Sequence, residues 1–295
     1  MAERATGSTV PRRQLGRYLR DLRNQARLTV RSAAHQLEWS EAKMWRIETG
    51  QSSLRSFDVE TMCKVYGAPA DITEALMGLA KETKAKGWWH AYGDVIPEGF
   101  DVYIGLEEAA SSLASYQNDL VPGLLQTEGY ARAVFRRHNP DETEEDVERR
   151  VRLRVERQTL LTRVSDPSSL RLVLNEAVLR RPVGGKDVMA GQLAHLVEVA
   201  ERPNIEIRVA SFAAGLHLGM LSGSFIVLRF PTNGDGAETE PPTVYVDGYT
   251  GSLYLDKPNE VQSYETAFGD IWESSLGEEA SRRLIADTAG SHGQD

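Results

Sequence analysis

Apolar residues recur at intervals of three and four along the first 80 residues, a spacing that predicts a series of amphipathic helices. The clearest part of this pattern is Leu28 to Gly50, LTVRSAAHQLEWSEAKMWRIETG. Thr29 and Ser40 can each cap a short helix, because a side-chain oxygen at that position accepts a hydrogen bond from a free backbone N–H group. The inward positions of the two helices are Ala33, Ala34, Leu37, Met44 and Ile47. The pattern therefore predicts two short helices joined by a tight turn, with Trp39 at their junction.

Amphipathic stripes on both sides of this pair predict three further helices. The stripes consist of Leu15, Tyr18, Leu19 and Leu22 before the pair, Phe57, Val59, Met62, Cys63 and Tyr66 after it, and Ile72, Leu76 and Leu79 in the last helix. Asp71 and Glu74 have the spacing of a capping box, which predicts that the last helix begins at Asp71. Five helices within about 75 residues are enough for a small all-α domain.

Beyond Phe100 the pattern mixes helical and strand-like segments, which predicts an α+β domain. Helices are expected over Tyr103 to Tyr116, from Thr127 onward, over Thr143 to about Val164, which would be the longest, and over Val188 to Glu201 and Val261 to Ser274. Five strand-like runs are separated by glycine and proline residues. They are Leu170–Leu174, Ile205–Val209, Ser224–Phe230, Thr243–Val246 and Leu253–Leu255.

The chain is therefore expected to be multidomain, with an N-terminal all-α five-helix domain and a C-terminal α+β domain. The expected divisions are a disordered arm at 1–10, the helical domain at 11–86, a connector at 87–100, the α+β domain at 101–288 and a disordered tail at 289–295. The connector contains Trp88 and Trp89, and we expect this pair to pack against protein, since paired tryptophans seldom remain in solvent. A stacking platform for single-stranded nucleic acid is the alternative.

Charge is divided unevenly along the 295 residues. The whole chain has a net charge of −9, yet residues 1–60 contain eleven Arg or Lys and seven acidic residues, a net of +4. Positive charge concentrated on one helical segment is typical of a surface that binds the DNA backbone. The alternative is an arginine-rich helix that only solvates its outer face.

Composition excludes several other classes of protein. No uninterrupted apolar run approaches the roughly 18 residues of a membrane helix, and the first ten residues lack a secretory apolar core. We therefore expect a cytoplasmic protein without a membrane partner. The single cysteine, Cys63, excludes an internal disulfide and a multi-cysteine zinc site, and its place on an apolar helical face predicts a buried core thiol.

The segment from Arg12 to about Lys84 resembles the five-helix DNA-binding domain of XRE-type, lambda-repressor-like regulators. The central signature of that family corresponds without a gap to Leu28 to Gly50, which ends in Ile-Glu-Thr-Gly. Two positions differ from the family pattern. Val30 replaces a glutamine that often helps to hold a phosphate, and Glu38 replaces a glycine in the turn. A left-handed conformation at Glu38 would cost about 1–2 kcal/mol relative to glycine.

This resemblance implies a helix that enters the DNA major groove. We expect Ser40, Glu41, Lys43 and Arg46 to face the groove, with Lys43 or Arg46 contacting guanine edges. The residues expected to contact phosphate, and so to set affinity and salt dependence, are Arg13, Arg17, Arg31 and Arg55. One such helix reads too few bases for genome-scale specificity, so we expect a homodimer on double-stranded DNA with half-sites about 34 Å apart.

The C-terminal half resembles actinobacterial XRE-type regulators that carry a large C-terminal domain of poorly defined function. The matching phrases occur in the same order: VPGLLQTEGYARA from Val121, VERRVRLRVERQTLL from Val147, NEAVLRRPVGG, QLAHLVEVA, GSFIVLRF and VYVDG. Members of that family are commonly encoded next to a very small protein, and several are described as its antitoxin-like partner. The resemblance therefore implies dimerisation and binding of a small protein by the C-terminal domain. Two alternatives remain: an antitoxin-like interaction protein that only autoregulates its gene, and a repressor that responds to a small molecule.

The arginine-rich segment from Val147 could be a second DNA-binding surface, but its spacing favours a structural role. Acidic residues precede arginines by four positions in three pairs, which stabilises an exposed helix. Apolar residues lie on two opposite sides of the same helix, which predicts burial on both sides, in its own domain or against a partner subunit. The three pairs are Glu145–Arg149, Asp146–Arg150 and Glu148–Arg152.

No sequence pattern indicates catalysis or a cofactor. HExxH, a Walker loop and GxSxG are absent, and Gly234-Asp235-Gly236 lies in a polar loop without a following helix. His217 is the most exposed-looking candidate ligand, although a lone loop histidine is more often at the surface or hydrogen-bonded. We expect a protein that is not an enzyme and needs no cofactor or metal.

Overall fold

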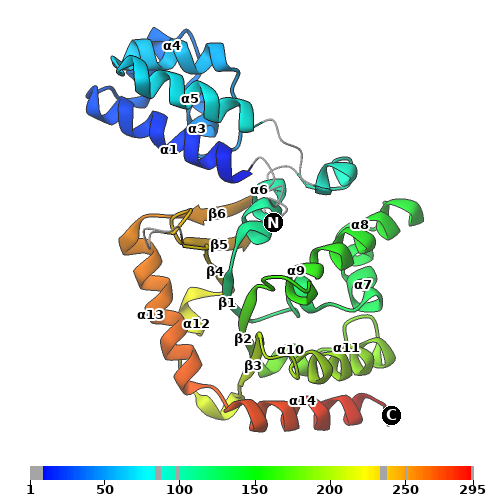
Figure 1. Ribbon diagram of the computed structural model, residues 1–295. Helices are drawn as coiled ribbons and strands as arrows, with labels where there is room; N and C mark the ends of the chain where they lie inside the picture. The colour runs from blue at the N-terminus through cyan, green and yellow to red at the C-terminus, as the bar shows by residue number, and fades with distance from the viewer. Residues whose placement is uncertain (1–8, 84–87, 98–99, 233–237, 250, 294–295) are drawn as a thin grey trace. The chain divides into compact units, whose positions relative to one another are not determined.

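The chain folds into two units, Met1–Ala109 and Ala110–Asp295, each of which is considered by itself (Figure 1). The computed structural model describes residues 9–83, 88–97, 100–232, 238–249 and 251–293. Residues 1–8, most of the predicted N-terminal arm, lie outside the described residues. Thr9 and Val10, also assigned to that arm, instead begin the first helix.

The N-terminal unit contains the five predicted helices. They are α1 (Thr9–Gln25), α2 (Val30–Gln36), α3 (Glu41–Glu48), α4 (Ser56–Tyr66) and α5 (Ala70–Glu82). A 3-10 helix, η1 (Trp88–Tyr92), and helix α6 (Phe100–Ala109) follow in the same unit. In the predicted connector, Trp89 is buried (1% exposed) and Trp88 is partly exposed (37%).

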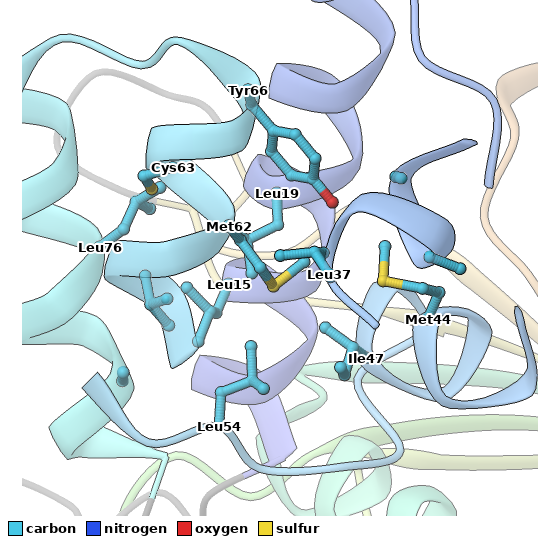
Figure 2. Close-up of a cluster of buried hydrophobic side chains, with 14 residues drawn as sticks. Leu15, Leu19, Leu37, Met44, Ile47, Leu54, Met62, Cys63, Tyr66 and Leu76 are labelled. Atoms are coloured by element: carbon cyan, nitrogen blue, oxygen red, sulfur yellow. The ribbon is translucent and has the colours of Figure 1, made fainter. Parts of the chain in front are cut away.

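One apolar core joins α1 to α5. Figure 2 shows Leu15 and Leu19 of α1 pointing toward Met44 and Ile47 of α3 and Met62 of α4. Cys63 is fully buried, which confirms the prediction of a core thiol. The periodicity of apolar residues thus predicted most of this core, although Ile72, assigned to the stripe of the last helix, is 40% exposed.

The start of α5 differs from the prediction. The helix begins at Ala70, one residue before the expected cap, and Pro69 occupies the N-cap position without a side-chain hydrogen bond. Asp71 therefore lies within the first turn. An acidic residue there still stabilises the helix through the helix dipole, which explains why the sequence resembled a capping box.

The C-terminal unit contains a six-stranded mixed sheet in the order β3-β2-β1-β4-β5-β6. Strands β1, β2 and β3 are parallel, and β4, β5 and β6 continue the sheet in antiparallel pairs. The strands are β1 (Ser112–Gln117), β2 (Ser169–Asn175), β3 (Ile205–Ala210), β4 (Phe225–Arg229), β5 (Thr243–Gly248) and β6 (Gly251–Leu255). The five predicted strands are present, and β1 is an additional central strand.

The prediction of a helix over Tyr103 to Tyr116 is wrong in its second half. Helix α6 ends at Ala109, and Ser112 to Gln117 form the strand between β2 and β4. Ser115 and Tyr116 are buried in succession, so the segment lacks the strict alternation that distinguishes a strand from a short helix. Leu113 and Tyr116 are buried three positions apart, which explains the helical appearance of this segment.

Helices surround this sheet. They are α7 (Glu128–His138), α8 (Glu144–Arg157), α9 (Thr159–Thr162), α10 (Glu176–Arg180), α11 (Lys186–Val199), α12 (Gly219–Ser222), α13 (Pro258–Ser274) and α14 (Glu278–Gly293), with short 3-10 helices η2 (Gly123–Leu125) and η3 (Phe212–Ala214). Helix α13 packs on the sheet through a core that includes Tyr116, Phe225, Val244, Phe268 and Trp272. The predicted helix over Thr143 to Val164 is divided at Gln158, so it is shorter than α13 and is not the longest.

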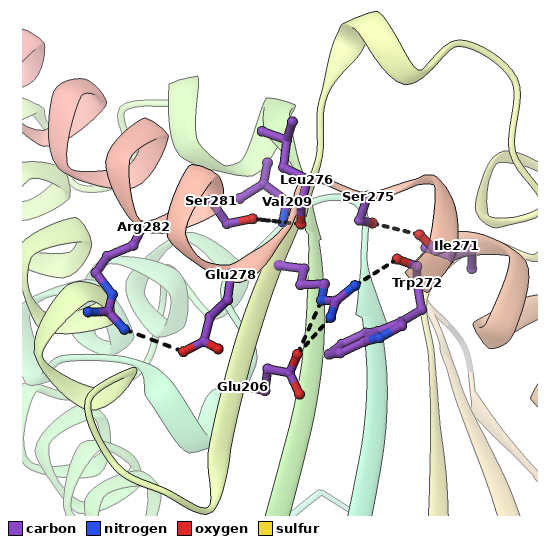
Figure 3. A network of polar contacts seen from close by, with 10 residues as sticks. Glu206, Val209, Ile271, Trp272, Ser275, Leu276, Glu278, Ser281 and Arg282 are labelled. Atoms are coloured by element: carbon purple, nitrogen blue, oxygen red, sulfur yellow. Dashed lines mark hydrogen bonds and ion pairs between the residues drawn. The ribbon is translucent and has the colours of Figure 1, made fainter.

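The last two helices are fixed to the edge strand β3 by polar contacts (Figure 3). The backbone N–H of Val209 donates to the Ser281 hydroxyl (3.0 Å), which in turn donates to the carbonyl of Leu276 (3.1 Å). The Arg208 guanidinium lies over the Trp272 ring, 4.1 Å from its centroid. Because α14 continues to Gly293, residues 289–293 are helical and the prediction of a disordered tail is wrong for them. Residues 294–295 lie outside the described residues.

Candidate DNA-binding surface

Two capped helices and a left-handed turn place α3 at the surface of the N-terminal unit. The Thr29 hydroxyl oxygen accepts a hydrogen bond from the Ser32 N–H, and Ser40 accepts one from the Lys43 N–H, both at 3.1 Å. Glu38 adopts the left-handed conformation (φ +57°) that the resemblance implied for this turn. The two caps and the turn therefore agree with the sequence prediction.

Close contact with α1 holds α3 in position. A methyl group added at Gly16 of α1 would lie 2.4 Å from the Ile47 carbonyl oxygen and 3.0 Å from that of Glu48. Any larger residue at Gly16 would therefore push α3 away from α1. Just beyond the same end of α3, Gly50 has φ +73° and lies directly against the backbone of Arg13.

A buried ion pair connects the same two helices, and sequence reasoning missed it. The Arg23 guanidinium donates to both carboxylate oxygens of Glu48, at 2.6 and 2.8 Å, and also to the Leu28 carbonyl oxygen at 2.8 Å. The hydrogen bond with Glu48 raises the pKa of Arg23, and burial together with the charge of Glu48 raises the pKa of Tyr66. One signal could have revealed the pair: Glu48 follows Met44 by four residues and therefore lies on the inward face of α3.

The outward face of α3 is centred on Ala42 and Arg46. Met44, Ile47 and Glu48 are the buried residues of this helix. With about 3.6 residues per turn, Ala42 and Arg46 lie nearly opposite Met44, and both are exposed. The small side chain of Ala42 allows close approach, and the Arg46 guanidinium can reach beyond it.

The other residues predicted to face the groove are partly engaged by their neighbours. Glu41 is exposed and accepts a hydrogen bond from the Arg31 guanidinium at 3.1 Å. The Lys43 ammonium lies 3.4 Å from the centroid of the Trp39 ring, so it must leave that ring before it can contact DNA. Ser40 is exposed and caps α3. Arg46 is therefore the best placed of the predicted groove residues.

The residues predicted to contact phosphate do not all share the required exposure. Arg31 and Arg55 have side chains that are 87% and 85% exposed, and Arg55 pairs with Asp58 at 3.4 Å at the start of α4. Arg17 is half-buried. Arg13 is only 4% exposed and lies against Gly50, so this buried side chain is poorly placed for the predicted phosphate contact.

Three aromatic side chains of the N-terminal unit are also exposed. Trp45 on α3 is 55% exposed, Phe57 at the start of α4 is 74% exposed and Tyr18 on α1 is 50% exposed. Trp45 was predicted on the outer face of its helix, whereas Tyr18 and Phe57 were predicted on inward stripes, and for these two residues the prediction is wrong.

Two known families match the chain. A family described as a helix-turn-helix domain matches residues 14–76. A domain of unknown function, DUF5753, matches residues 100–287, which is more than half of the chain. The chain belongs to the DUF5753 family. No curated protein and no solved structure matches it.

The helix-turn-helix match agrees with the geometry of α2 and α3. Together they indicate that this DUF5753 protein is a DNA-binding regulator whose N-terminal unit carries the DNA-binding domain. In the residues that the structure describes, no helix is long and apolar enough to cross a membrane.

The DUF5753 half shows no metal site within its described part: no cluster of three or more His, Cys, Asp or Glu side chains there could hold an ion. His217 is buried (6% exposed), which corrects its exposed appearance in the sequence. Its Nδ1 accepts a hydrogen bond from the Gly219 N–H at 3.2 Å, and its ring meets the Tyr116 ring edge-on. His217 therefore helps to hold the loop between β3 and β4 in place.

The arginine-rich helix α8 of the DUF5753 half is tied to neighbouring segments by ion pairs. Arg132 of α7 pairs with Glu148, Arg136 pairs with Glu144 at 2.5 Å, and Arg150 pairs with Glu142 at 2.6 Å. These contacts favour the structural interpretation of the helix over a second DNA-binding surface.

Proposed function

We propose that this DUF5753 protein is a sequence-specific transcriptional regulator of the XRE type that binds double-stranded DNA as a homodimer. The observation that carries the proposal is the outward face of α3, where exposed Arg46 lies beside the small Ala42 on a helix fixed by a buried ion pair. A rigid helix of this kind can present an arginine to base edges without reorganisation on binding.

In the proposed complex, Arg46 donates two hydrogen bonds to the O6 and N7 atoms of a guanine. Glu41 can accept a hydrogen bond from a cytosine amino group, and Ser40 can contact either kind of base. The exposed guanidinium groups of Arg31 and Arg55 contact phosphate. These phosphate contacts supply affinity that falls with salt concentration and does not depend on sequence.

The DUF5753 half is proposed to hold the dimer together and to bind a small protein, as the resemblance to antitoxin-like regulators implies. We also propose that the protein acts by binding and not by catalysis. Co-purification with the product of a neighbouring small gene, present in equal amount, would support the small partner. A bound metabolite would instead support a repressor that responds to a small molecule.

Selection of bound sequences from a random DNA library, followed by fluorescence anisotropy titrations, tests the DNA-reading role. We expect Arg46→Ala to weaken binding to the selected sequence by roughly 1–3 kcal/mol, or about 5- to 150-fold, with little effect on shuffled DNA. Equal weakening on both DNAs would show that Arg46 does not read bases.

Two further variants serve as references for this experiment. Arg55→Ala should weaken binding to both DNAs alike and reduce the salt slope by about 1, as expected for a phosphate contact. Arg283→Ala removes the same charge from an exposed position on α14 and should change neither affinity.

A further inference from the structure

A loop of the C-terminal unit holds an unusual number of large apolar side chains in solvent. Between β3 and β4, five such residues within ten positions are exposed. They are Phe212 (61%), Leu216 (79%), Leu218 (37%), Met220 (60%) and Leu221 (75%). Residues 209–224 contain no Asp, Glu, Lys or Arg. We call residues 212–221 the apolar loop.

The apolar loop is anchored by polar contacts, so its outward side chains are held in place. The Phe212 N–H donates to the Glu176 carboxylate and the Leu218 N–H donates to the Asp270 carboxylate, both at 2.8 Å. His217 and Gly219 are the inward residues of the loop, and a methyl group at Gly219 would lie 2.4 Å from the Tyr116 ring. Turning the leucines inward would break these contacts.

The packing of the C-terminal unit does not explain why the apolar loop exposes these five side chains. The loop connects the edge strand β3 to β4, and two strands, β2 and β1, lie between them in the sheet. A connection of this kind needs only polar or small residues to cross the end of a sheet. Exposed contiguous apolar surface is instead typical of a site that contacts another protein.

The charge of the C-terminal unit helps to identify the partner. Residues 110–295 contain 19 Arg or Lys and 28 Asp or Glu, a net of −9. Two such units repel each other except where they meet through uncharged surface. The apolar loop itself contains no charged residue over ten positions, so its leucines can face those of an identical loop without placing like charges directly opposite each other.

The exposed area is also of the right order for a dimer. Together the five side chains expose the equivalent of about three complete large residues. At about 150 Å² each, the low end of the range for large side chains, this is roughly 450 Å² per copy. A stable complex buries about 800 Å² per partner, so the loop could form the apolar centre of such an interface.

We propose that the apolar loop is the self-association surface of this protein, and that it contacts the same loop of a second copy across a two-fold axis. A contact of that symmetry requires one patch that is complementary to itself, which a neutral apolar loop provides. The proposal rests on the proposed function in one respect: a regulator that reads two half-sites needs two copies. The apolar loop is the surface that joins these two copies.

Sedimentation equilibrium of the full chain tests this surface. The wild-type protein is expected to have the mass of two chains at micromolar concentration. The double variant Leu216→Asp/Leu221→Asp is expected to raise the dimer dissociation constant at least about 100-fold, because it places two carboxylates of each copy in the interface. Val164→Asp adds a carboxylate at a fully exposed apolar residue of the same unit and should leave the dimer intact.

A spin label at residue 216 gives a second measurement. Cys63 is buried, so Leu216→Cys supplies an accessible thiol that can be labelled selectively. A short distance between two labels is expected for Leu216→Cys. A label introduced by Val164→Cys should give no short distance. A monomeric wild-type protein, or a dimer that the double variant leaves intact, would overturn the proposal.

DNA titrations separate this proposal from the proposed function. If the double variant is folded by circular dichroism, binds one half-site normally and loses cooperative binding to two half-sites, both proposals are supported. A wild-type dimer that the double variant disrupts, but that binds selected and shuffled DNA equally, supports the surface and refutes sequence-specific DNA reading. Sequence-specific binding by a dimer that survives the double substitution refutes the surface alone.

Discussion

Replacing Glu48 with leucine tests whether the buried ion pair holds α3 in position. The Arg23 and Glu48 side chains are only 9% and 7% exposed, so the pair is shielded from water. Glu48→Leu would leave the Arg23 guanidinium buried without the carboxylate that accepts two of its hydrogen bonds. Loss of one partner from a buried pair costs about 3–5 kcal/mol. A domain of this size has a total stability of roughly 5–15 kcal/mol, so the N-terminal unit should lose a large part of it.

Hydrogen exchange of the full chain, read by mass spectrometry across a urea series, measures this loss in each unit separately. Peptides from α1 and α3 should lose about 3–5 kcal/mol of protection in Glu48→Leu. Peptides from β1 and β2 belong to the other unit and provide an internal reference. The double variant Arg23→Met/Glu48→Leu should recover part of the loss, because it no longer buries an unpaired charge.

The matched control is Glu41→Leu, which removes the carboxylate of the exposed pair with Arg31 on the same helix. The Arg31 and Glu41 side chains are 87% and 55% exposed, and exposed pairs contribute only about 0–1 kcal/mol. If Glu48→Leu destabilises α3 no more than Glu41→Leu does, the buried pair does not have the structural role inferred here.

Two further predictions concern packing and pH. Gly16→Ala should destabilise the N-terminal unit by about 1–3 kcal/mol, because the added methyl group meets the Ile47 carbonyl at 2.4 Å. Gly78→Ala in α5, where nothing lies within 4 Å of the added methyl group, should stabilise the unit by about 0.5–1 kcal/mol. Equal stability changes of the two variants in urea unfolding would contradict this reasoning. Burial lowers the pKa of His195 on α11 below its ordinary value of about 6.5. The unfolded chain therefore takes up this proton first as the pH falls below about 6.5, and stability declines until the lower pKa of the folded state is reached. His195→Leu should reduce the loss of stability between pH 7.5 and pH 5.0 in urea titrations of the C-terminal unit, and an unchanged loss would show that His195 is not responsible.

The parts of the fold that follow from local pattern were predicted from the sequence, whereas those that depend on distant neighbours were not. Thr29 and Ser40 cap their helices as expected, because capping needs only the next three residues. The strand at Ser112–Gln117 was missed because Leu113 and Tyr116 are buried three positions apart in this central strand, which gives its apolar residues a helical spacing. Its sequence alone does not distinguish this environment from that of a short helix.

The same limit applies to the candidate site. Arg46 was placed on the outward face of α3 from helical periodicity, and the structure agrees. Arg13 was expected to contact phosphate, but it is buried against Gly50 through a contact between residues 37 positions apart. Glu48 was counted only as an acidic residue, although its position in the helix could have indicated burial.

The structure also changes the argument from charge. Residues 1–60 have a net charge of +4, but the N-terminal unit as a whole has 15 basic and 15 acidic residues and is neutral. Net charge therefore does not explain attraction to DNA, and the placement of individual charges must do so. Glu48 is neutralised inside the unit by Arg23, while Glu41 and Asp58 form exposed pairs with Arg31 and Arg55. Exposed pairs of this kind are weak, so a phosphate group can compete for either arginine. The proposed DNA-facing side of the unit can thus bind phosphate although the unit has no net positive charge, and a Glu41 released from Arg31 could then accept a hydrogen bond from a base.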